Sequence, residues 1–383
     1  MSGKLSRRSG TVDPFIVMDV MAAAAEKEAT GETVVHLEVG QPSTPAPKGA
    51  LMAARAALDS DRIGYVAALG IPALRERIAR HYREVYGTDV PADRVVVTTG
   101  SSGGFPLVFL ASFDPGDRVA LAAPGYPAYR NILSALNLEA VDLPTSAADR
   151  FQPTVAALEK AGRIDGLILA SPSNPTGTMV NRAELKALAD WCSRNGVRLI
   201  SDEIYHGIVY EGETHSAVEV SDSAIVVNSF SKYFSMTGWR VGWLVVPPDL
   251  VRPIERLTQN FFISVPTLSQ HAALAAFECR DELDGHVRRY RANRDLLMAG
   301  LPQAGFDRLT PAQGAFYIYA DISHLTNDSR EFCSRMLREA GVATTPGIDF
   351  DRARGAGTLR ISFAGSTAEM DEAVRRLKAW RRV

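Results

Sequence analysis

A lysine between two serines, with an arginine eight residues later, is the pattern in this chain with the clearest chemical use. Residues 229–240 have the sequence SFSKYFSMTGWR and follow the apolar run AIVVN. Burial after a strand makes a lysine cation costly and lowers its pKa, which favours a nucleophilic amine able to form a Schiff base. The hydroxyls of Ser229 and Ser231 and the guanidinium of Arg240 suit a phosphate. Lys232 is therefore a candidate nucleophile beside a phosphate site.

A second phosphate-binding candidate is the segment TTGSSGG at 98–104, between an expected strand and an expected helix. Amides at a helix N-terminus attract anions, and glycines let the backbone approach a ligand closely. The segment lacks the GxGxxG spacing of a dinucleotide site and the GxxxxGK[ST] spacing of a triphosphate loop. These differences argue against NAD and ATP as ligands.

Three further polar residues follow apolar segments. Asp202 and Tyr205 lie three apart in SDEIY, and Asn174 lies in SPSNPTG. Taken alone, Asp202 is typical of a helix cap and Asn174 of a turn before Pro175. Together with Lys232 and two phosphate-binding elements, they form a combination much more specific than any single member.

The elements that must position these residues are short apolar runs alternating with helical patterns. The segments predicted to contain strands are 94–100, 117–127, 139–144, 165–177, 197–205, 224–232 and 240–247, and a helix is predicted at 182–196. Strands that are apolar throughout and separated by helices indicate an α/β fold with a mostly parallel sheet covered on both faces. Ligands bind such sheets beyond the carboxyl ends of the strands. Five polar loops are therefore expected to meet at one edge of the sheet: TTGSSGG, APGYP, SPSNPTG, SDEIY and SFSK.

The pattern changes after about residue 280 to long charged helices and strands such as AFYIYAD and TLRISFA. This change predicts a smaller α+β domain, joined by the N-terminal segment. We expect residues 1–47 to form an arm and part of the small domain, 48–279 the large domain, and 280–383 the small C-terminal domain. Within the arm, residues 13–29 are expected to form an amphipathic helix.

Composition narrows the class of protein. A net charge of -2 over 383 residues gives no reason to expect nucleic acid or an anionic membrane as a partner. No apolar run approaches the roughly 18 residues of a membrane helix, and Asp13, Pro14 and Asp19 interrupt a possible signal peptide. Three widely spaced cysteines fit a reduced compartment, so we expect a cytoplasmic protein. The seven histidines lack metal-ligand spacing, and no metal is expected.

The motifs together resemble the class I and II aminotransferases, the fold type I enzymes that use pyridoxal 5'-phosphate (PLP). The resemblance covers nearly the whole chain, in the order VGQP, IGYVAALGIPALRERIA, TTGSSGG, PGYPAY, SPSNPTG, SDEIY, SFSKYFSMTGWRVGW and LRISFA. It implies the PLP-dependent transferase fold. It also implies transfer of an amino group from an L-amino acid to a 2-oxo acid through a PLP aldimine on Lys232.

The resemblance implies roles around the cofactor ring. Asp202 is expected to pair with the pyridine nitrogen and keep it protonated, so that the ring serves as an electron sink. Tyr205 and Asn174 are expected to hydrogen-bond the phenolic oxygen of the ring, and Tyr126 to stack on it. Lys232, Asp202 and Tyr205 form the expected catalytic set.

The resemblance also implies how the phosphate and the substrate are held. Arg360 matches the arginine that binds the substrate α-carboxylate through a bidentate fork, with Gly40 and Asn174 beside it. Tyr65 matches a tyrosine that reaches the phosphate of the neighbouring subunit, which implies a homodimer with shared active sites. The residues expected to hold the phosphate within one chain are Ser101, Ser102, Ser229, Ser231 and Arg240.

One departure bears on the amino donor. Prokaryotic-type aspartate aminotransferases have a GGKQ segment in this region, whereas this chain has SSGG, and Ser102 stands at the place of the lysine that meets a distal carboxylate. The apolar and aromatic residues expected near the site, Phe15, Ile16, Tyr126 and Phe316, favour neutral or aromatic donors.

Two alternatives to aminotransfer stay open from the residues. A carbon–sulfur β-lyase or another α,β-eliminating enzyme would share the Lys232 constellation, because both reactions pass through the same carbanion. A non-catalytic PLP-binding regulatory module would place a DNA-binding domain ahead of the fold. The N-terminal segment shows no helix-turn-helix pattern and no basic excess.

Overall fold

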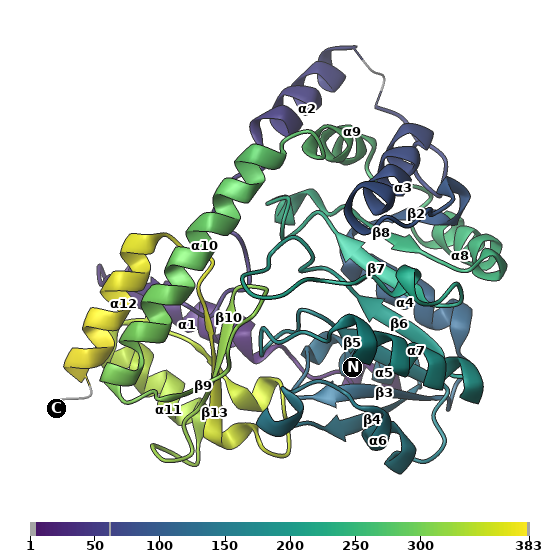
Figure 1. Ribbon diagram of the computed structural model, residues 1–383. Helices are drawn as coiled ribbons and strands as arrows, with labels where there is room; N and C mark the ends of the chain where they lie inside the picture. Colours follow the sequence, from purple (N-terminus) through teal and green to yellow (C-terminus); the bar gives the residue numbers. More distant parts are fainter. Residues whose placement is uncertain (1–4, 61–62, 381–383) are drawn as a thin grey trace.

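A seven-stranded sheet forms the centre of the computed structural model, which describes residues 5–60 and 63–380 (Figure 1). The strand order is β2-β8-β7-β6-β5-β3-β4. The run from β4 to β7 is parallel, whereas β8 is antiparallel to both β7 and β2. The predicted mostly parallel sheet is thus confirmed. Its strands are β2 (Val95–Thr98), β3 (Arg118–Ala123), β4 (Glu139–Pro144), β5 (Gly166–Ala170), β6 (Arg198–Asp202), β7 (Ile225–Ser229) and β8 (Gly242–Val245).

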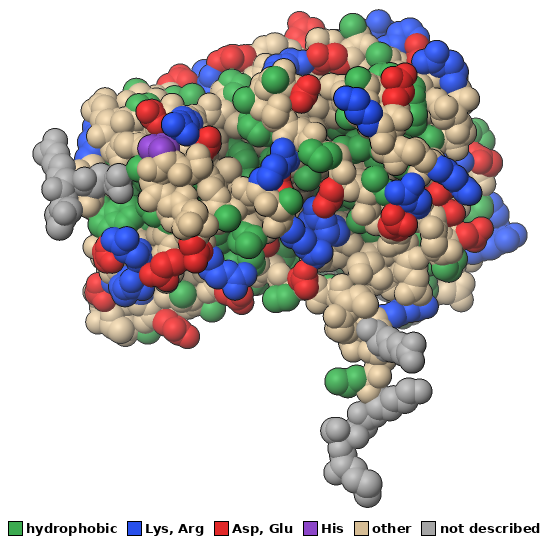
Figure 2. All heavy atoms as spheres, turned by 90° about the horizontal axis from the view of Figure 1, so that it is seen from below, with side chains coloured by type: hydrophobic (Ala, Val, Ile, Leu, Met, Phe, Trp, Pro, Cys, Tyr) green, Lys and Arg blue, Asp and Glu red, His purple; other side chains and the backbone are tan. Residues whose placement is uncertain are grey.

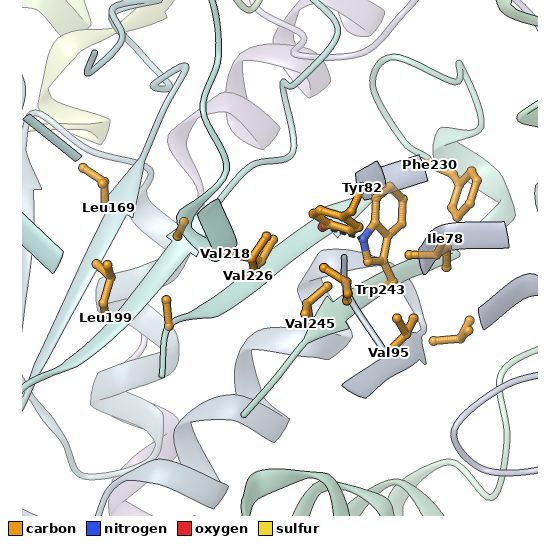
Figure 3. Close-up of a cluster of buried hydrophobic side chains, with 14 of the residues drawn as sticks. Ile78, Tyr82, Val95, Leu169, Leu199, Val218, Val226, Phe230, Trp243 and Val245 are labelled. Carbon is orange, nitrogen blue, oxygen red and sulfur yellow. Dashed lines mark hydrogen bonds between the residues drawn. The ribbon is translucent and has the colours of Figure 1, made fainter. Parts of the chain in front are cut away.

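The central strands are buried on both faces, which explains why their sequences are apolar without alternation. Every residue of β2, β7 and β8 is buried. Figure 3 shows Val226 of β7 and Trp243 of β8 near Tyr82 and Ile78 of helix α3 (Pro72–Tyr86). The Trp243 indole donates a 3.0 Å hydrogen bond to Tyr82 Oη, so the large ring is buried without an unpaired donor.

Helices cover both faces of this sheet (Figure 1). The predicted helix at 182–196 is confirmed as α7, which begins after Asn181 and ends before Gly196. Asn181 and Glu184 form a capping box, and Gly196 ends the helix with a φ of 67°. Besides α3, the helices around the sheet are α2 (Lys48–Ser60), α4 (Gly100–Ser112), α5 (Pro127–Ala135), α6 (Val155–Lys160), α7 (Arg182–Asn195), α8 (Pro248–Phe261) and α9 (Thr267–Ala276).

The C-terminal part contains an antiparallel sheet of order β12-β13-β10-β9. Its strands are β9 (Arg308–Leu309), β10 (Tyr317–Asp321), β12 (Thr345–Pro346) and β13 (Thr358–Ser362), and its helices are α10 (Arg280–Gly300), α11 (Ser329–Arg335) and α12 (Thr367–Trp380). In Figure 1, α10 runs from the region of α9 to this part.

The N-terminal segment joins the C-terminal part. Strand β1 (Val35–His36) pairs in parallel with β11 (Val342–Ala343), and α1 (Ile16–Ala29) lies against the same part (Figure 1). The helix predicted at 13–29 begins three residues later than expected, because its N-cap residue Phe15 has an extended backbone. We keep the division at 47/48 and 279/280 as a proposal, which this pairing supports.

Charged side chains of both signs are interspersed on the face shown in Figure 2, with apolar side chains between them. Across residues 5–60 and 63–380, none of the helices combines the length and the apolarity needed to cross a membrane.

Candidate active site

A cavity of about 430 Å³ lies where the carboxyl ends of β5 and β6 meet the C-terminal part. All five predicted polar loops contribute to it. Ser229 and Tyr65 are not among its lining residues. The predicted site residues that line it are Gly40, Ser101, Ser102, Tyr126, Asn174, Asp202, Tyr205, Ser231, Lys232, Arg240 and Arg360.

The Lys232 amine is partly buried in this cavity. Its Nζ donates a 2.6 Å hydrogen bond to the carbonyl of Gly40 and lies 5.8 Å from the centre of the Tyr205 ring. Burial lowers the pKa of Lys232 to about 8, and the charges of Arg360 and Arg240 act in the same direction. A substantial fraction of the amine is therefore neutral and nucleophilic near neutral pH.

Asp202 is the last residue of β6 and is buried at the cavity wall. Its Oδ1 accepts a 3.1 Å hydrogen bond from the Ile204 amide, and its Oδ2 accepts one from the Tyr129 hydroxyl. Burial raises the pKa of Asp202 to about 6, while both hydrogen bonds and the nearby Lys232 oppose that rise. The carboxyl group is thus mostly ionised at neutral pH, as an acceptor for a cationic donor.

Arg360 enters the cavity from β13 and is buried. Its Nη1 donates to Asn174 Oδ1 at 3.0 Å, and its Nη2 donates to the Glu38 carbonyl. The guanidinium carbon lies 4.5 Å from the centre of the Tyr317 ring. Its Nε is buried without a hydrogen-bond partner among the described residues. A rigidly held guanidinium with spare donor capacity is suited to a carboxylate.

A second wall of the cavity carries groups that suit an anion, in contrast to the anionic Asp202. It combines the N-terminus of α4 with the hydroxyl of Ser231 and the guanidinium of Arg240, whose Nη1 lies 3.5 Å from Ser231 Oγ. A Cβ on Gly100 would lie 2.5 Å from Arg240 Nη2, so glycine permits this close approach. Ser229 lies behind this wall, where its hydroxyl donates to Ser231 Oγ at 2.9 Å. Its direct contact is thus with Ser231.

Two tyrosines that the sequence interpretation missed complete the centre of the site. Tyr129 bonds Asp202, and the Tyr317 hydroxyl lies 2.7 Å from that of Tyr205. A Cβ on Gly40 would lie only 2.0 Å from Tyr317 Oη, so glycine is required at this position. A signal for Tyr129 exists in PGYPAY, where it stands three residues after Tyr126, one turn along a helix that begins at Pro127.

An apolar wall comes from the N-terminal segment. Its residues Phe15, Val17, Met18 and Met21 line the cavity, and the Phe15 ring stacks on Tyr126 with centroids 6.0 Å apart. Ile16 was expected in this wall and is not among the lining residues. The sequence pattern does not indicate which face of this helix turns towards the cavity, and in the structure Val17, Met18 and Met21 share that face of α1.

Phe316 was also expected near the donor and is not among the lining residues. It packs edge-on against Tyr205 and Tyr290 in the core of the C-terminal part. The centre of its ring lies 5.9 Å from Lys232 Nζ, so Phe316 is near the site and supports Tyr205 without lining the cavity.

A buried polar network supports the loop that follows Asp202. Glu203 accepts hydrogen bonds from Ser216 Oγ and the Ala217 amide, each at 2.8 Å. His206 contacts the carbonyl of Ser171 through Nε2 at 3.0 Å and the hydroxyl of Tyr86 through Nδ1 at 2.6 Å. Burial lowers the pKa of His206 to about 3, so the ring is neutral. It connects the loop carrying Tyr205 to the loop carrying Asn174.

Replacing Glu203 by glutamine is expected to change the pH dependence of stability. Burial raises the pKa of Glu203 from 4.5 to about 8, so the folded protein holds a proton that the unfolded chain releases between these values. Stability from this group is present below pH 4.5 and is lost as the pH rises towards 8. Relative to the variant, the wild-type protein should lose on the order of a few kcal/mol across this window.

The measurement is chemical unfolding at a series of pH values for the wild-type protein and Glu203→Gln. Glu213→Gln, at an exposed glutamate, is the matched control and should follow the wild-type protein. A constant difference between Glu203→Gln and wild type at all pH values would contradict this account of Glu203.

Comparison with known proteins places these features in one family. The profile for "Aminotransferase class I and II" matches residues 32–377. The valine–pyruvate aminotransferase of Mycobacterium tuberculosis is 53% identical over 99% of both chains. The aspartate/prephenate aminotransferase of Thermus thermophilus is 33% identical over 97% of both.

Solved structures agree with the sequence relatives. A crystal structure of an aminotransferase from Mycobacterium tuberculosis superposes with a TM-score of 0.97 at 53% identity, covering 100% of both chains. An aspartate aminotransferase from Thermus thermophilus with maleate gives 0.93 at 33% identity, covering 99% of this chain and 100% of that one. These relatives do not favour the lyase alternative. The chain belongs to the class I and II aminotransferases, with the fold type I architecture and an aminotransferase activity.

Proposed function

We propose that this enzyme uses PLP and that the cavity holds it. The residues present fit the group: an ionised, buried carboxylate at Asp202, a wall of amides, hydroxyls and Arg240, and the Lys232 amine. The placement of Lys232 in one cavity with Asp202 and Arg360 is the observation that carries the proposal. Ser101, Ser102 and Ser231 would hold the phosphate with Arg240, and Tyr126 would lie against the ring.

Bound PLP would supply an electron sink for charge that develops at the substrate α-carbon. The chain supplies the rest. The Lys232 amine, partly neutral at pH 7 to 8, can attack a carbonyl carbon and later accept and return the α-proton. Gly40 orients this amine through its carbonyl oxygen. The ionised carboxylate of Asp202 would accept a hydrogen bond from the protonated pyridine nitrogen of bound PLP.

Arg360 explains how one site can serve two substrates in turn. An L-amino acid and a 2-oxo acid share only the α-carboxylate and the carbon next to it. Arg360 would bind that carboxylate in both half-reactions, while the Asn174 amide oxygen keeps the guanidinium in place. The same fork would therefore align the α-carbon of either substrate towards Lys232.

We further propose a neutral, apolar amino donor of the valine type. Along the described lining of the cavity, the cationic side chains are Lys232, Arg240 and Arg360. All three have a proposed task, so a dicarboxylate donor would find no further cation on this chain for its distal group. The apolar α1 residues Val17 and Met21 match an aliphatic side chain. The relative from Mycobacterium tuberculosis named for valine supports this choice.

Ser102→Lys is expected to shift the donor preference towards aspartate. The substitution adds a cation at a position that lines the cavity, where a distal carboxylate could pair with it. We expect the ratio of kcat/KM for aspartate over valine to rise about tenfold or more. Steady-state rates with both donors measure this ratio. Ser102→Met, which adds similar length without charge, is the control, and an equal rise in both variants would contradict the charge argument.

A homodimer in the cytoplasm is proposed as the working state. Tyr65 is 82% exposed in one chain, and exposed apolar side chains at Met52, Leu58, Phe261 and Ile263 accompany it. Covering these side chains with a second copy would remove apolar surface from water. It would also allow Tyr65 to reach the partner's phosphate site.

The rate at which the cofactor-free protein captures PLP covalently is expected to rise with pH through a midpoint near 8 and to level off at higher pH. Only the neutral form of Lys232 is nucleophilic, and its pKa is lowered to about 8. Stopped-flow absorbance between pH 6 and 10 gives the profile, with borohydride trapping to show attachment at Lys232. A midpoint near that of an ordinary lysine, above pH 10, would contradict the proposed environment.

The experiment that tests the proposed function follows nitrogen from donor to acceptor. Purified enzyme with PLP is given ¹⁵N-labelled valine and unlabelled pyruvate. Labelled alanine and 2-oxoisovalerate in equal amounts, with ping-pong kinetics, are expected. Ammonia release without labelled alanine would overturn aminotransfer from valine, and a faster reaction with labelled aspartate would overturn the donor class alone.

A further inference from the structure

Tyr129 lies in the site and is the last residue of the PGYPAY motif. The family resemblance assigns a role to Tyr126 in this motif and none to Tyr129. It lies in the first turn of α5, is 4% exposed, and packs edge-on against Phe105 and Tyr126 with centroids 5.1 and 5.3 Å away. Its hydroxyl donates a hydrogen bond to Asp202 Oδ2. The two neighbouring rings pack against Tyr129 in the orientation that reaches this carboxylate.

The direction of this hydrogen bond follows from the surroundings. Burial and the charge of Asp202 raise the pKa of Tyr129 well above its ordinary value, so the hydroxyl keeps its proton and acts as donor. The Ile204 amide donates to the other carboxylate oxygen at 3.1 Å. With one donor on each oxygen, both oxygens of ionised Asp202 accept a hydrogen bond. A proton on either oxygen would face the hydrogen of Tyr129 or of the Ile204 amide, so these contacts favour the ionised form.

Among the groups that face Asp202 from neighbouring elements, Tyr129 is the side chain that hydrogen-bonds it directly. The Lys232 cation favours the ionised carboxylate through space, and burial opposes it. Tyr126 lies on the same wall, and its own pKa is raised to about 12, so it stays neutral. Removing the Tyr129 hydroxyl would therefore leave one oxygen of a buried carboxylate without its donor and make the carboxylate a stronger base.

We propose that Tyr129 is a positioning residue that fixes the orientation and ionisation of Asp202 and thereby keeps the pyridine nitrogen of the bound cofactor protonated. The inference rests on the proposed function, in which Asp202 faces that nitrogen. A proton shared between nitrogen and carboxylate moves towards the stronger base. By weakening Asp202 as a base, the Tyr129 hydroxyl keeps the proton on nitrogen, where it strengthens the ring as an electron sink.

The test uses holoenzyme loaded with PLP that carries ¹⁵N in its ring, because the nitrogen chemical shift reports protonation without any turnover. Spectra are compared for wild type, Tyr129→Phe, Asp202→Asn and Tyr82→Phe. Tyr82 is the matched control, since it is also a buried tyrosine whose hydroxyl has a single side-chain partner, Trp243, outside the cavity. In Tyr129→Phe we expect the ¹⁵N signal to move towards that of neutral pyridine, and kcat to fall about 10- to 100-fold with KM little changed. Tyr82→Phe should keep the wild-type shift.

A second variant keeps the test decisive if Tyr129→Phe folds poorly. Site-specific 3-fluorotyrosine at position 129 retains the ring and the hydroxyl but donates more strongly, so the ¹⁵N signal should move further towards the protonated position. A wild-type shift in either Tyr129 variant, with a normal response in Asp202→Asn, would overturn the role of Tyr129 alone. An unchanged shift in Asp202→Asn, or no PLP binding by the wild-type protein, would instead overturn the proposed function beneath it.

Discussion

Replacing Lys232 by alanine is expected to lower kcat for transamination by about 10⁴-fold or more. One amine is assigned two tasks, attack on a carbonyl and transfer of the α-proton, and loss of a positioned acid–base group alone costs 10²- to 10⁴-fold. No other described amine lines the cavity to replace it. Single-turnover rates with ¹⁵N-labelled valine would measure the loss directly, separately from product release.

The same variant should retain much of its noncovalent affinity for PLP, because the anion-binding wall and Asp202 are unchanged. Equilibrium dialysis would test this point. Lys186→Ala removes an exposed lysine paired with Asp190 on α7 and should behave as the wild-type protein. A Lys232→Ala enzyme that kept more than about one hundredth of the wild-type kcat would show that another group moves the proton.

The sheet and much of the site could be predicted because their signals are local. A strand buried on both faces is continuously apolar, so β5, β6 and β7 are visible in sequence, and a polar residue directly after each must lie at the same edge. The carboxyl-end rule predicts that Asn174, Asp202 and Lys232 lie at one edge of the sheet, and in the structure all three line one cavity.

The contacts that the sequence could not predict depend on distances between segments far apart in the chain. Tyr317 lies more than one hundred residues from its partner Tyr205, and ring packing in the C-terminal part decides which of Phe316 and Tyr317 faces the cavity. The donor wall similarly depends on the phase of α1, which is fixed where the chain leaves Phe15 and the Ile16 amide bonds Asp349. Neither feature has a periodic signal of its own.

Arg360→Lys is expected to lower kcat/KM by about 100-fold for the amino acid and for the 2-oxo acid alike. Lysine keeps the charge but loses the planar fork, so it cannot bind a carboxylate through two donors while a third bonds Asn174. Loss of well-placed hydrogen bonds to a buried charge costs about 3 kcal/mol, which corresponds to roughly that factor. Half-reaction kinetics, run separately with valine and with pyruvate, would measure both values.

Equal losses in the two half-reactions are the feature that distinguishes binding of the shared carboxylate from recognition of one substrate's own side chain. Arg294→Lys is the matched control, because Arg294 is also a buried arginine of the C-terminal part, paired with Glu211 away from the cavity. That variant should lose stability without a selective rise in KM. If Arg360→Lys impaired only the amino acid half-reaction, the guanidinium would instead contact a group that only the amino donor carries. That outcome would contradict binding of the shared carboxylate. Since the α-carboxylate is present in both substrates and the side chains differ, an arginine bound to the shared group should slow both half-reactions equally, whereas an arginine bound to one substrate's side chain should not.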